Sequence, residues 1–414
     1  MTGVSDLRIN SARLMGDLES LAAIGRASEG GIHRAAFSDA YRQAVDWLID
    51  RMQAAGMETR IDAVGNVIGR MGPADGAVIM TGSHIDTVRN GGPLDGALGV
   101  LAGIEVARVL SENKVVLGAP YEVVAFNDEE GAFLSLMGAM ALSGTIRDED
   151  LQSAANAEGV RLIDAMRESG LDPDRYHQAA YPAESIAKYL ELHIEQGPVL
   201  ENLDLEIGVV DGIVCQRNIE YTFRGQSNHA GTTPMNMRRD TFRAAAEFVT
   251  HSYALLDQGY ANESTRMTFG TCAIAPGYSN VIPRETTVRL DNRDLDESSS
   301  ARLVERVAQI AVETADKYNV EIDINERCTN PAALMDGGLI ESLQAVARDL
   351  GYSHQVMPSG AGHDAQAMAL ICKAGMIFVP SRRGLSHHPD EWTAPELLAK
   401  GVNVLLQALL RELS

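Results

Sequence analysis

The sequence has few aromatic residues and few cysteines. Aromatic residues make up 5% of the 414 positions and hydrophobic residues as a whole make up 45%, which is typical of a soluble α/β enzyme. The chain is long enough for two domains. Its four cysteines have no paired spacing, so we predict neither a disulfide framework nor a thiolate zinc site and interpret them as packing residues: Cys215, Cys272, Cys328 and Cys372.

An excess of positive charge is also lacking, because the net charge is −22 at pH 7. Such a chain suits neither the phosphate backbone nor an anionic membrane surface, so we expect no nucleic acid and no membrane partner. The longest apolar run, residues 97–106, contains Glu105 and is far shorter than the roughly 20 residues that span a bilayer. Residues 1–8 show no export signal, and the expected location is the cytoplasm.

The first functional signal is a histidine and two aspartates that follow an apolar run. Residues 77–81 predict a buried strand that ends at a glycine, so His84 and Asp86 leave its carboxyl end together. Ligands bind at that edge in open α/β sheets. Asp95 lies beside an apolar helix expected over residues 98–110. An imidazole and a carboxylate suit a divalent cation, although Asp95 could equally cap the helix and His84 could be a hydrogen-bonded loop residue.

Two further predicted strands end in possible ligands. The apolar run 121–126 is followed by Asp128, Glu129 and Glu130, and consecutive acids repel one another unless a cation neutralises them. A solvated acidic loop is the alternative. His193 closes another apolar-rich run before a Gly-Pro pair. A strand histidine is by itself more often structural than a metal ligand.

The order of predicted elements indicates an insertion. From about residue 215 the pattern becomes strand, helix, strand, strand, helix, strand, which is the split βαβ arrangement of ferredoxin-like domains. Elements similar to those at the start of the chain return near its end. We therefore expect a discontinuous domain of residues 1–214 and 329–414 and an inserted domain of residues 215–328.

Five candidate ligands follow strands of one predicted sheet. One carboxylate that bridges two cations ~3.5–4 Å apart, with a histidine and one further residue completing each, is a plausible dinuclear site. The candidates are His84, Asp95, Glu130, His193 and one of His387 or His388.

Five motifs together resemble the hydantoinase/carbamoylase branch of the M20 metallopeptidase-like amidohydrolases, over nearly the whole chain. They are Gly-Ser-His84-Ile-Asp86-Thr-Val, Pro-Leu-Asp95-Gly, Asn-Asp-Glu129-Glu130-Gly, Leu-His193-Ile-Glu-Gln196-Gly-Pro and Ser386-His387-His388-Pro-Asp-Glu. The resemblance implies an α/β catalytic domain with a mostly parallel sheet between helices. It also implies that the inserted ferredoxin-like βαββαβ domain is a lid and dimerisation domain, and that the protein is a homodimer.

The resemblance further implies two divalent ions per subunit, zinc or alternatively manganese, cobalt or nickel. Asp95 would bridge the ions, with His84 and His193 completing one site. Glu130 and His387 would complete the other, because His388 falls on a variable position of the motif.

The same resemblance implies roles around the ions. Asp86 would orient His84, and Glu129 would be the general base. His229, within Gln-Ser-Asn-His-Ala-Gly, would stabilise the oxyanion. The remaining implied substrate contacts are Gln196 and a pair that would hold a carboxylate, Asn280 and Arg293.

The implied activity is hydrolysis of the ureido C–N bond of an N-carbamoyl-L-amino acid, or of an N-carbamoyl-β-amino acid. Allantoate or ureidoglycolate amidohydrolase is the nearest alternative, and an M20 peptidase or acyl-amino acid deacylase is more distant. A non-enzymatic metal-binding protein is disfavoured, because it would have little reason to keep Glu129. Two departures from the family pattern leave the exact substrate open: Ala132-Phe133-Leu134 after Gly131, and Asn292 before Arg293.

Overall fold

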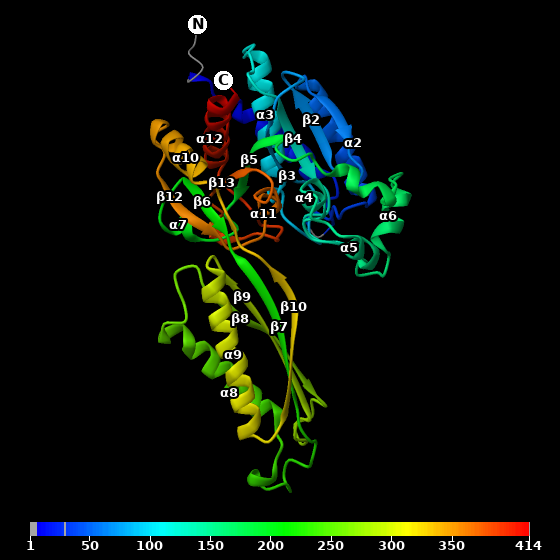
Figure 1. The fold of residues 1–414 in the computed structure, drawn as a ribbon, viewed down its shortest axis with the longest axis vertical. Helices are drawn as coiled ribbons and strands as arrows, with labels where there is room; N and C mark the ends of the chain where they lie inside the picture. Colours follow the sequence, from blue (N-terminus) through cyan, green and yellow to red (C-terminus); the bar gives the residue numbers. More distant parts are fainter. Residues whose placement is uncertain (1–5, 29, 414) are drawn as a thin grey trace. The chain divides into compact units, whose positions relative to one another are not determined.

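A computed structural model describes residues 6–28 and 30–413. Residues 1–5, which belong to the segment examined for an export signal, lie outside that part. The chain separates into a large unit, Met1–Asp211 with Leu334–Ser414, and an inserted unit, Gly212–Ala333 (Figure 1). Within residues 6–28 and 30–413, no helix is both long and apolar enough to cross a membrane.

The large unit is built on one mixed sheet in the order β1-β2-β4-β3-β5-β13-β6-β11, with β12 paired to β6. Its four central strands, β4, β3, β5 and β13, are parallel, and antiparallel neighbours flank them on both sides. The predicted α/β class with a largely parallel central sheet is confirmed. The strands are β1 (Glu58–Ile61), β2 (Val67–Met71), β3 (Val78–His84), β4 (Tyr121–Phe126), β5 (Ile186–Ile194), β6 (Ile207–Ile213), β11 (Ala333–Leu334), β12 (His354–Ser359) and β13 (Lys373–Val379).

The central strands are buried along their length, as the apolar runs predicted. All seven residues of β3 and all six of β4 are buried, so both faces of these strands are covered. The prediction that the strand stops at Gly82 is wrong, because β3 continues to His84. A side chain at Gly82 would begin 2.0 Å from the carbonyl oxygen of Val124, so this glycine permits close strand pairing rather than a turn.

Five long helices share the main hydrophobic core with the sheet. They are α1 (Ser11–Ala23), α2 (Asp39–Ala54), α3 (Ala97–Glu112), α10 (Gly337–Asp349) and α12 (Pro395–Leu413). Shorter helices and 3₁₀ turns also belong to this unit. They are α4 (Met137–Leu142), α5 (Asp148–Ser153), α6 (Leu162–Glu168), α7 (Val199–Asn202), α11 (Asp364–Met368), and the 3₁₀ turns η2 (Pro173–Ala179) and η5 (Arg382–Gly384).

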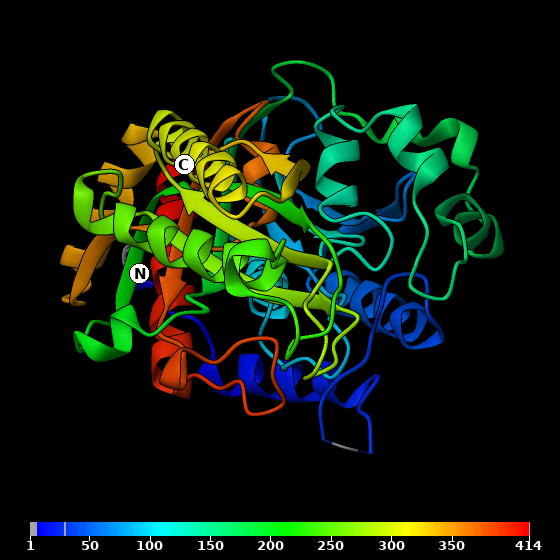
Figure 2. The ribbon, with the colours of Figure 1, turned by 90° about the horizontal axis from the view of Figure 1, so that it is seen from below.

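The inserted unit has the βαββαβ order read from the sequence. Its four antiparallel strands lie in the order β10-β7-β9-β8. Helices α8 and α9 contact each other along the sheet (Figures 1 and 2) and share a separate core with it. The elements are β7 (Cys215–Arg224), η3 (Met235–Met237), α8 (Thr241–Ala254), η4 (Leu255–Gln258), β8 (Arg266–Ala275), β9 (Glu285–Asp294), α9 (Glu297–Lys317) and β10 (Glu321–Asn330).

Candidate metal centre and active site

The five predicted ligands lie in the large unit, mostly at the carboxyl ends of its parallel strands. His84 is the last residue of β3, and His193 is the next to last of β5. Glu130 follows β4, and Asp95 lies just before α3. The fifth, His387, comes from the loop before α12, so residues far apart in the chain meet at one edge of the sheet.

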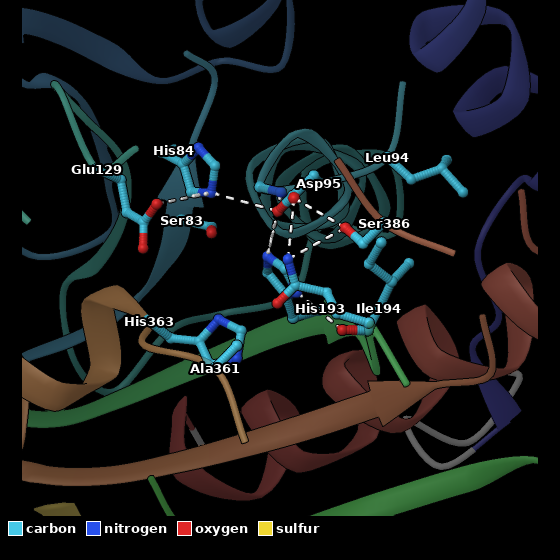
Figure 3. Close-up of polar contacts among 12 residues, drawn as sticks. Ser83, His84, Leu94, Asp95, Glu129, His193, Ile194, Ala361, His363 and Ser386 are labelled. Atoms are coloured by element: carbon cyan, nitrogen blue, oxygen red, sulfur yellow. Dashed lines mark hydrogen bonds and ion pairs between the residues drawn. The ribbon is translucent and has the colours of Figure 1, made fainter. Parts of the chain in front are cut away.

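Asp95 lies at the centre of this group, and its two carboxylate oxygens face different partners. Oδ1 is 3.1 Å from His193 Nε2 and 3.6 Å from His84 Nε2. Oδ2 is 3.1 Å from His387 Nε2, which is also 3.3 Å from Glu130 Oε2. Figure 3 shows the first half of this arrangement. Two groups therefore share Asp95 and could each hold a metal ion: His84, Asp95 and His193, and Asp95, Glu130 and His387.

Backbone carbonyls orient the two buried histidines. Nδ1 of His84 is 3.0 Å from the carbonyl oxygen of Asp86, and Nδ1 of His193 is 2.9 Å from that of Ile194. A carbonyl only accepts hydrogen bonds, so each Nδ1 carries a proton. Each Nε2 faces Asp95, and without a metal ion it donates to that carboxylate. Imidazole nitrogens so fixed, together with carboxylate oxygens, fit a divalent ion such as zinc.

The carboxylate of Asp86 is 3.6 Å from His84 Nδ1. Its closest bonds run to the other ligand loop, where it accepts the backbone N–H groups of Glu130 at 3.1 Å and Glu129 at 3.3 Å. Oε2 of Glu129 lies 3.5 Å from His84 Nε2. Asp86 therefore connects the loop after β3 to the loop after β4 and sets the distance between the proposed base and the ligands.

Burial and mutual contact shift the pKa values of this cluster strongly. Burial raises the pKa of Glu129 well above its usual value and that of Glu130 to about 7. Asp95 is also buried, yet hydrogen bonds from His193, His387 and His84 hold its pKa well below the usual value. The bond to Asp95 raises the pKa of His387 to about 9. Buried acids in such number need positive charge beside them, which a divalent cation provides.

Glu391 is the last residue of the Ser386 motif, and no role was predicted for it. Its Oε1 accepts the backbone N–H groups of Leu94 at 2.8 Å and Asp95 at 3.0 Å. Its Oε2 lies 2.9 Å from the hydroxyl of Ser386, which is also 3.0 Å from Asp95 Oδ2. A side chain at Gly92 would begin 2.3 Å from Glu391, so the turn before Asp95 wraps around this carboxylate. An acid two residues after an X-Pro pair was its only sequence signal.

Gln196, predicted to contact substrate, lies against the shared carboxylate. Its Nε2 donates to Asp95 Oδ2 at 2.9 Å and to the Ser386 hydroxyl at 3.1 Å. His363, which the sequence analysis passed over, lies behind His193 with the ring centroids 4.4 Å apart. Its Nε2 is 2.9 Å from the hydroxyl of Ser359, and burial lowers the pKa of His363 well below its usual value. A neutral ring thus packs against His193.

The inserted unit carries the other three predicted residues, at two separate places. His229 forms an isolated β-bridge with Val281, and the N–H of Ala230 donates to the carbonyl of Asn280 at 2.9 Å. His229 and Asn280 therefore lie together, just before β9 begins. Arg293 lies near the other end of β9, where its Nε donates to Asp291 Oδ1 at 2.9 Å. From Glu285 to Arg293 the strand advances roughly 26 Å at ~3.3 Å per residue.

The sequence profile of peptidase family M20/M25/M40 matches residues 80–411. The chain belongs to this family. It is 40% identical over 402 residues to the N-carbamoyl-L-amino acid amidohydrolase of Geobacillus stearothermophilus, covering 96% of this chain and 97% of that one. It is 36% identical over 392 residues to the allantoate amidohydrolase of Escherichia coli (strain K12), covering 93% and 94%.

Among solved structures, the hydantoinase/carbamoylase family amidase from Burkholderia multivorans matches with a TM-score of 0.91 at 31% identity, covering 98% of each chain. The predicted membership of the hydantoinase/carbamoylase branch is confirmed, and the protein is a hydrolase of C–N amide bonds. M20 family enzymes use divalent metal ions. The two groups that share Asp95 are candidate ligand sets for such ions.

Proposed function

We propose that this M20 enzyme hydrolyses the ureido C–N bond of an N-carbamoyl-L-amino acid, or of an N-carbamoyl-β-amino acid, with two divalent ions per subunit. One water is consumed, and the amino acid, carbon dioxide and ammonia are released. The proposal of two ions rests on Asp95, because its two carboxylate oxygens face two different ligand groups. The Geobacillus relative at 40% identity supports the substrate class.

The chain's own groups supply the proton transfers. Ions held by the two groups that share Asp95 would supply Lewis-acid chemistry at the scissile carbonyl. Glu129 takes a proton from the attacking water at its carboxylate and delivers it to the leaving nitrogen. Its position suits this task, because Oε2 lies 3.5 Å from His84 Nε2 and because burial raises its pKa. The amide of Gln196 and the hydroxyl of Ser386 both donate to Oδ2 of Asp95 and so hold this carboxylate in place.

The substrate carboxylate is assigned to Arg293 and Asn280, and the oxyanion to His229. Within one inserted unit, Arg293 lies near one end of β9, while His229 and Asn280 lie beyond the other end. An amino-acid-sized substrate cannot span the roughly 26 Å of strand between them. We therefore infer that His229 and Asn280 reach the site from a second copy of the chain.

The edge strand of the inserted sheet offers a route to such a dimer. Of the described strands, β8 has β9 as its one neighbour. Its residues Thr271, Cys272, Ala273 and Ile274 are all exposed. An edge strand with unpaired backbone groups can continue into the sheet of a twofold-related copy. This supports a homodimer formed through β8.

Allantoate is the second candidate substrate, because the Escherichia coli relative at 36% identity is an allantoate amidohydrolase. The test is a panel of N-carbamoyl-L-amino acids, β-ureidopropionate, allantoate, ureidoglycolate and N-acyl-amino acids, assayed with protein loaded separately with zinc, manganese, cobalt or nickel. We expect turnover of the carbamoyl compounds, loss of turnover on chelation and recovery on readdition. Full turnover in a verified metal-free preparation would contradict the metal part, and turnover of allantoate alone would contradict the substrate class.

A further inference from the structure

A cavity of about 560 Å³ opens in the large unit beside the candidate metal centre. It lies between the loops after β3 and β4, and Glu130 forms part of its wall. None of the proposed substrate contacts lines it. A substrate whose carbamoyl group lies at the ligands therefore has room to extend into this space.

Part of the cavity wall is apolar. Ala36, Phe37 and Ala165 line it and are buried, and Val88 and Phe133 add partly buried apolar surface. The rings of Phe37 and Phe133 meet edge to face, with centroids 5.7 Å apart and an interplanar angle of 79°. Apart from Glu130, the acidic and basic side chains that line the cavity are exposed: Arg89, Glu158 and Glu168.

Hydrogen bonds fix Phe133 relative to the loop after β4, which carries Glu129 and Glu130. The buried carboxylate of Asp128 accepts the backbone N–H groups of Leu134 at 2.8 Å and Phe133 at 3.0 Å. The carbonyl of Glu129 accepts the N–H of Leu136 at 3.0 Å. Phe133 and Glu130 therefore belong to one pinned turn, and the cavity is already shaped before a substrate arrives.

We propose that this cavity receives the side chain of the amino-acid moiety and selects large apolar side chains, aromatic ones above all. The inference rests on the proposed carbamoyl hydrolase function and narrows its substrate class. An aromatic side chain would bury its ring against the Phe37–Phe133 corner, where edge-to-face contacts are favourable. Where the second ureido group of allantoate lies against the apolar part of the wall, beside Ala36 and Val88, it would instead lose hydrogen bonds to water that these side chains cannot replace.

The experiment compares kcat/KM for the N-carbamoyl derivatives of glycine, L-aspartate and L-phenylalanine, with allantoate alongside. We expect a preference for the phenylalanine over the glycine derivative of about tenfold or more. Phe133→Ala removes half of the aromatic corner and should lower this ratio about tenfold, with the glycine derivative changed less than about threefold. Ala132→Leu places a larger side chain in the cavity from the same turn. It should lower kcat/KM for the phenylalanine derivative and leave that for the glycine derivative unchanged.

Phe269→Ala is the matched control, because it also removes one ring of an edge-to-face pair, but in the inserted unit. The partner ring is Tyr253, with the centroids 5.6 Å apart and an interplanar angle of 75°. It should leave the ratio unchanged, and melting temperature and metal content identify any variant that fails to fold. If carbamoyl compounds are hydrolysed but neither cavity variant moves the ratio, the side chain binds elsewhere and the proposal is wrong. If no carbamoyl compound is hydrolysed at all, the function itself is wrong and this substrate class falls with it.

Discussion

Asp95 contacts the histidines of both candidate ligand groups. Its Oδ1 faces two histidines of the sheet, and its Oδ2 faces His387 and two further donors, Gln196 and Ser386. Its position also depends on Glu391, which accepts the backbone N–H of Leu94 and of Asp95 itself. At the residue scale, both proposed ion positions therefore depend on how firmly one carboxylate is held.

Glu129→Gln should leave the ions bound and lower kcat by ~10² or more, because the amide cannot accept a proton from water. Metal analysis of the purified variant and steady-state rates on an N-carbamoyl amino acid provide the measurement. Loss of one ion from the variant would mean that Glu129 is a ligand and that Glu130 is the base.

Glu391→Ala should weaken both ion positions together, by roughly 10–100-fold, the usual effect of removing a group that orients a ligand. Asp62→Ala is the matched control: Asp62 Oδ1 also accepts two backbone N–H groups, from Val64 at 3.0 Å and Asn66 at 2.9 Å, but in the β1–β2 hairpin. Competitive chelator titration measures each affinity. An unchanged affinity, or weakening at one ion position only, would contradict the role of Glu391 in holding the shared carboxylate.

At the scale of elements, the architecture of the inserted unit separates the residues that we propose to contact the substrate. Strand β9 runs ten residues, Glu285–Asp294, and places Arg293 near its end. The turn before β9 carries Asn280 and bridges to His229. The departure at Asn292 has a structural reason, since this buried side chain accepts from Ser300 at 2.6 Å and donates to the carbonyl of Arg266 at 3.2 Å.

Ala273→Lys should weaken dimerisation through β8, because a lysine on an edge strand opposes pairing with another strand. We expect the dimer dissociation constant to rise at least about tenfold, measured by sedimentation equilibrium. Thr250→Lys adds the same charge at an exposed position of α8 and should leave association unchanged. Equal dissociation constants for Ala273→Lys and the unmodified protein would exclude β8 as the interface.

At the scale of the whole molecule, the proposed site needs two chains. Glu129→Gln subunits and His229→Ala subunits should each be inactive as homodimers. Mixed dimers should regain one intact site, built from Glu129 of one chain and His229 of the other, and hence up to about half of the activity per dimer. Fluorescence exchange between differently labelled chains verifies mixing. Verified mixing without recovered activity would place His229 in its own chain's site.

Metal binding should release protons. In the metal-free protein the pKa of His387 is about 9 and that of Glu130 about 7, so at pH 7.5 the ion displaces a proton from His387 and some of the protons on Glu130. The apparent affinity should therefore fall as pH falls, by up to about tenfold per unit for each proton displaced. Calorimetry in two buffers with different ionisation enthalpies counts these protons. A heat of binding that is the same in both buffers would contradict the predicted protonation.

Much of the chemistry and topology follows from the sequence alone. Apolar runs predicted β4 at its observed bounds, and the period of the pattern predicted α3, α9 and the βαββαβ order of the inserted unit, because burial imposes those patterns on neighbouring residues. The motifs around His84, Asp95 and His193 indicated a metal site because those side chains lie at the ends of strands or at the start of a helix. Their match to a known branch supplied the family and the candidate roles.

Only the tertiary structure decided how distant segments meet. Residues that no local sequence pattern relates come together in three places. Glu391 accepts the backbone N–H of Asp95, His363 packs on His193, and Phe133 lines the cavity with residues from distant loops. The predicted end of the strand at Gly82 was wrong, because the sequence does not distinguish a glycine that permits close strand pairing from one that ends a strand. Likewise, the roughly 26 Å of β9 that separates Arg293 from Asn280 depends on the strand being extended and continuous, which the chain acquires only when it is paired within a sheet.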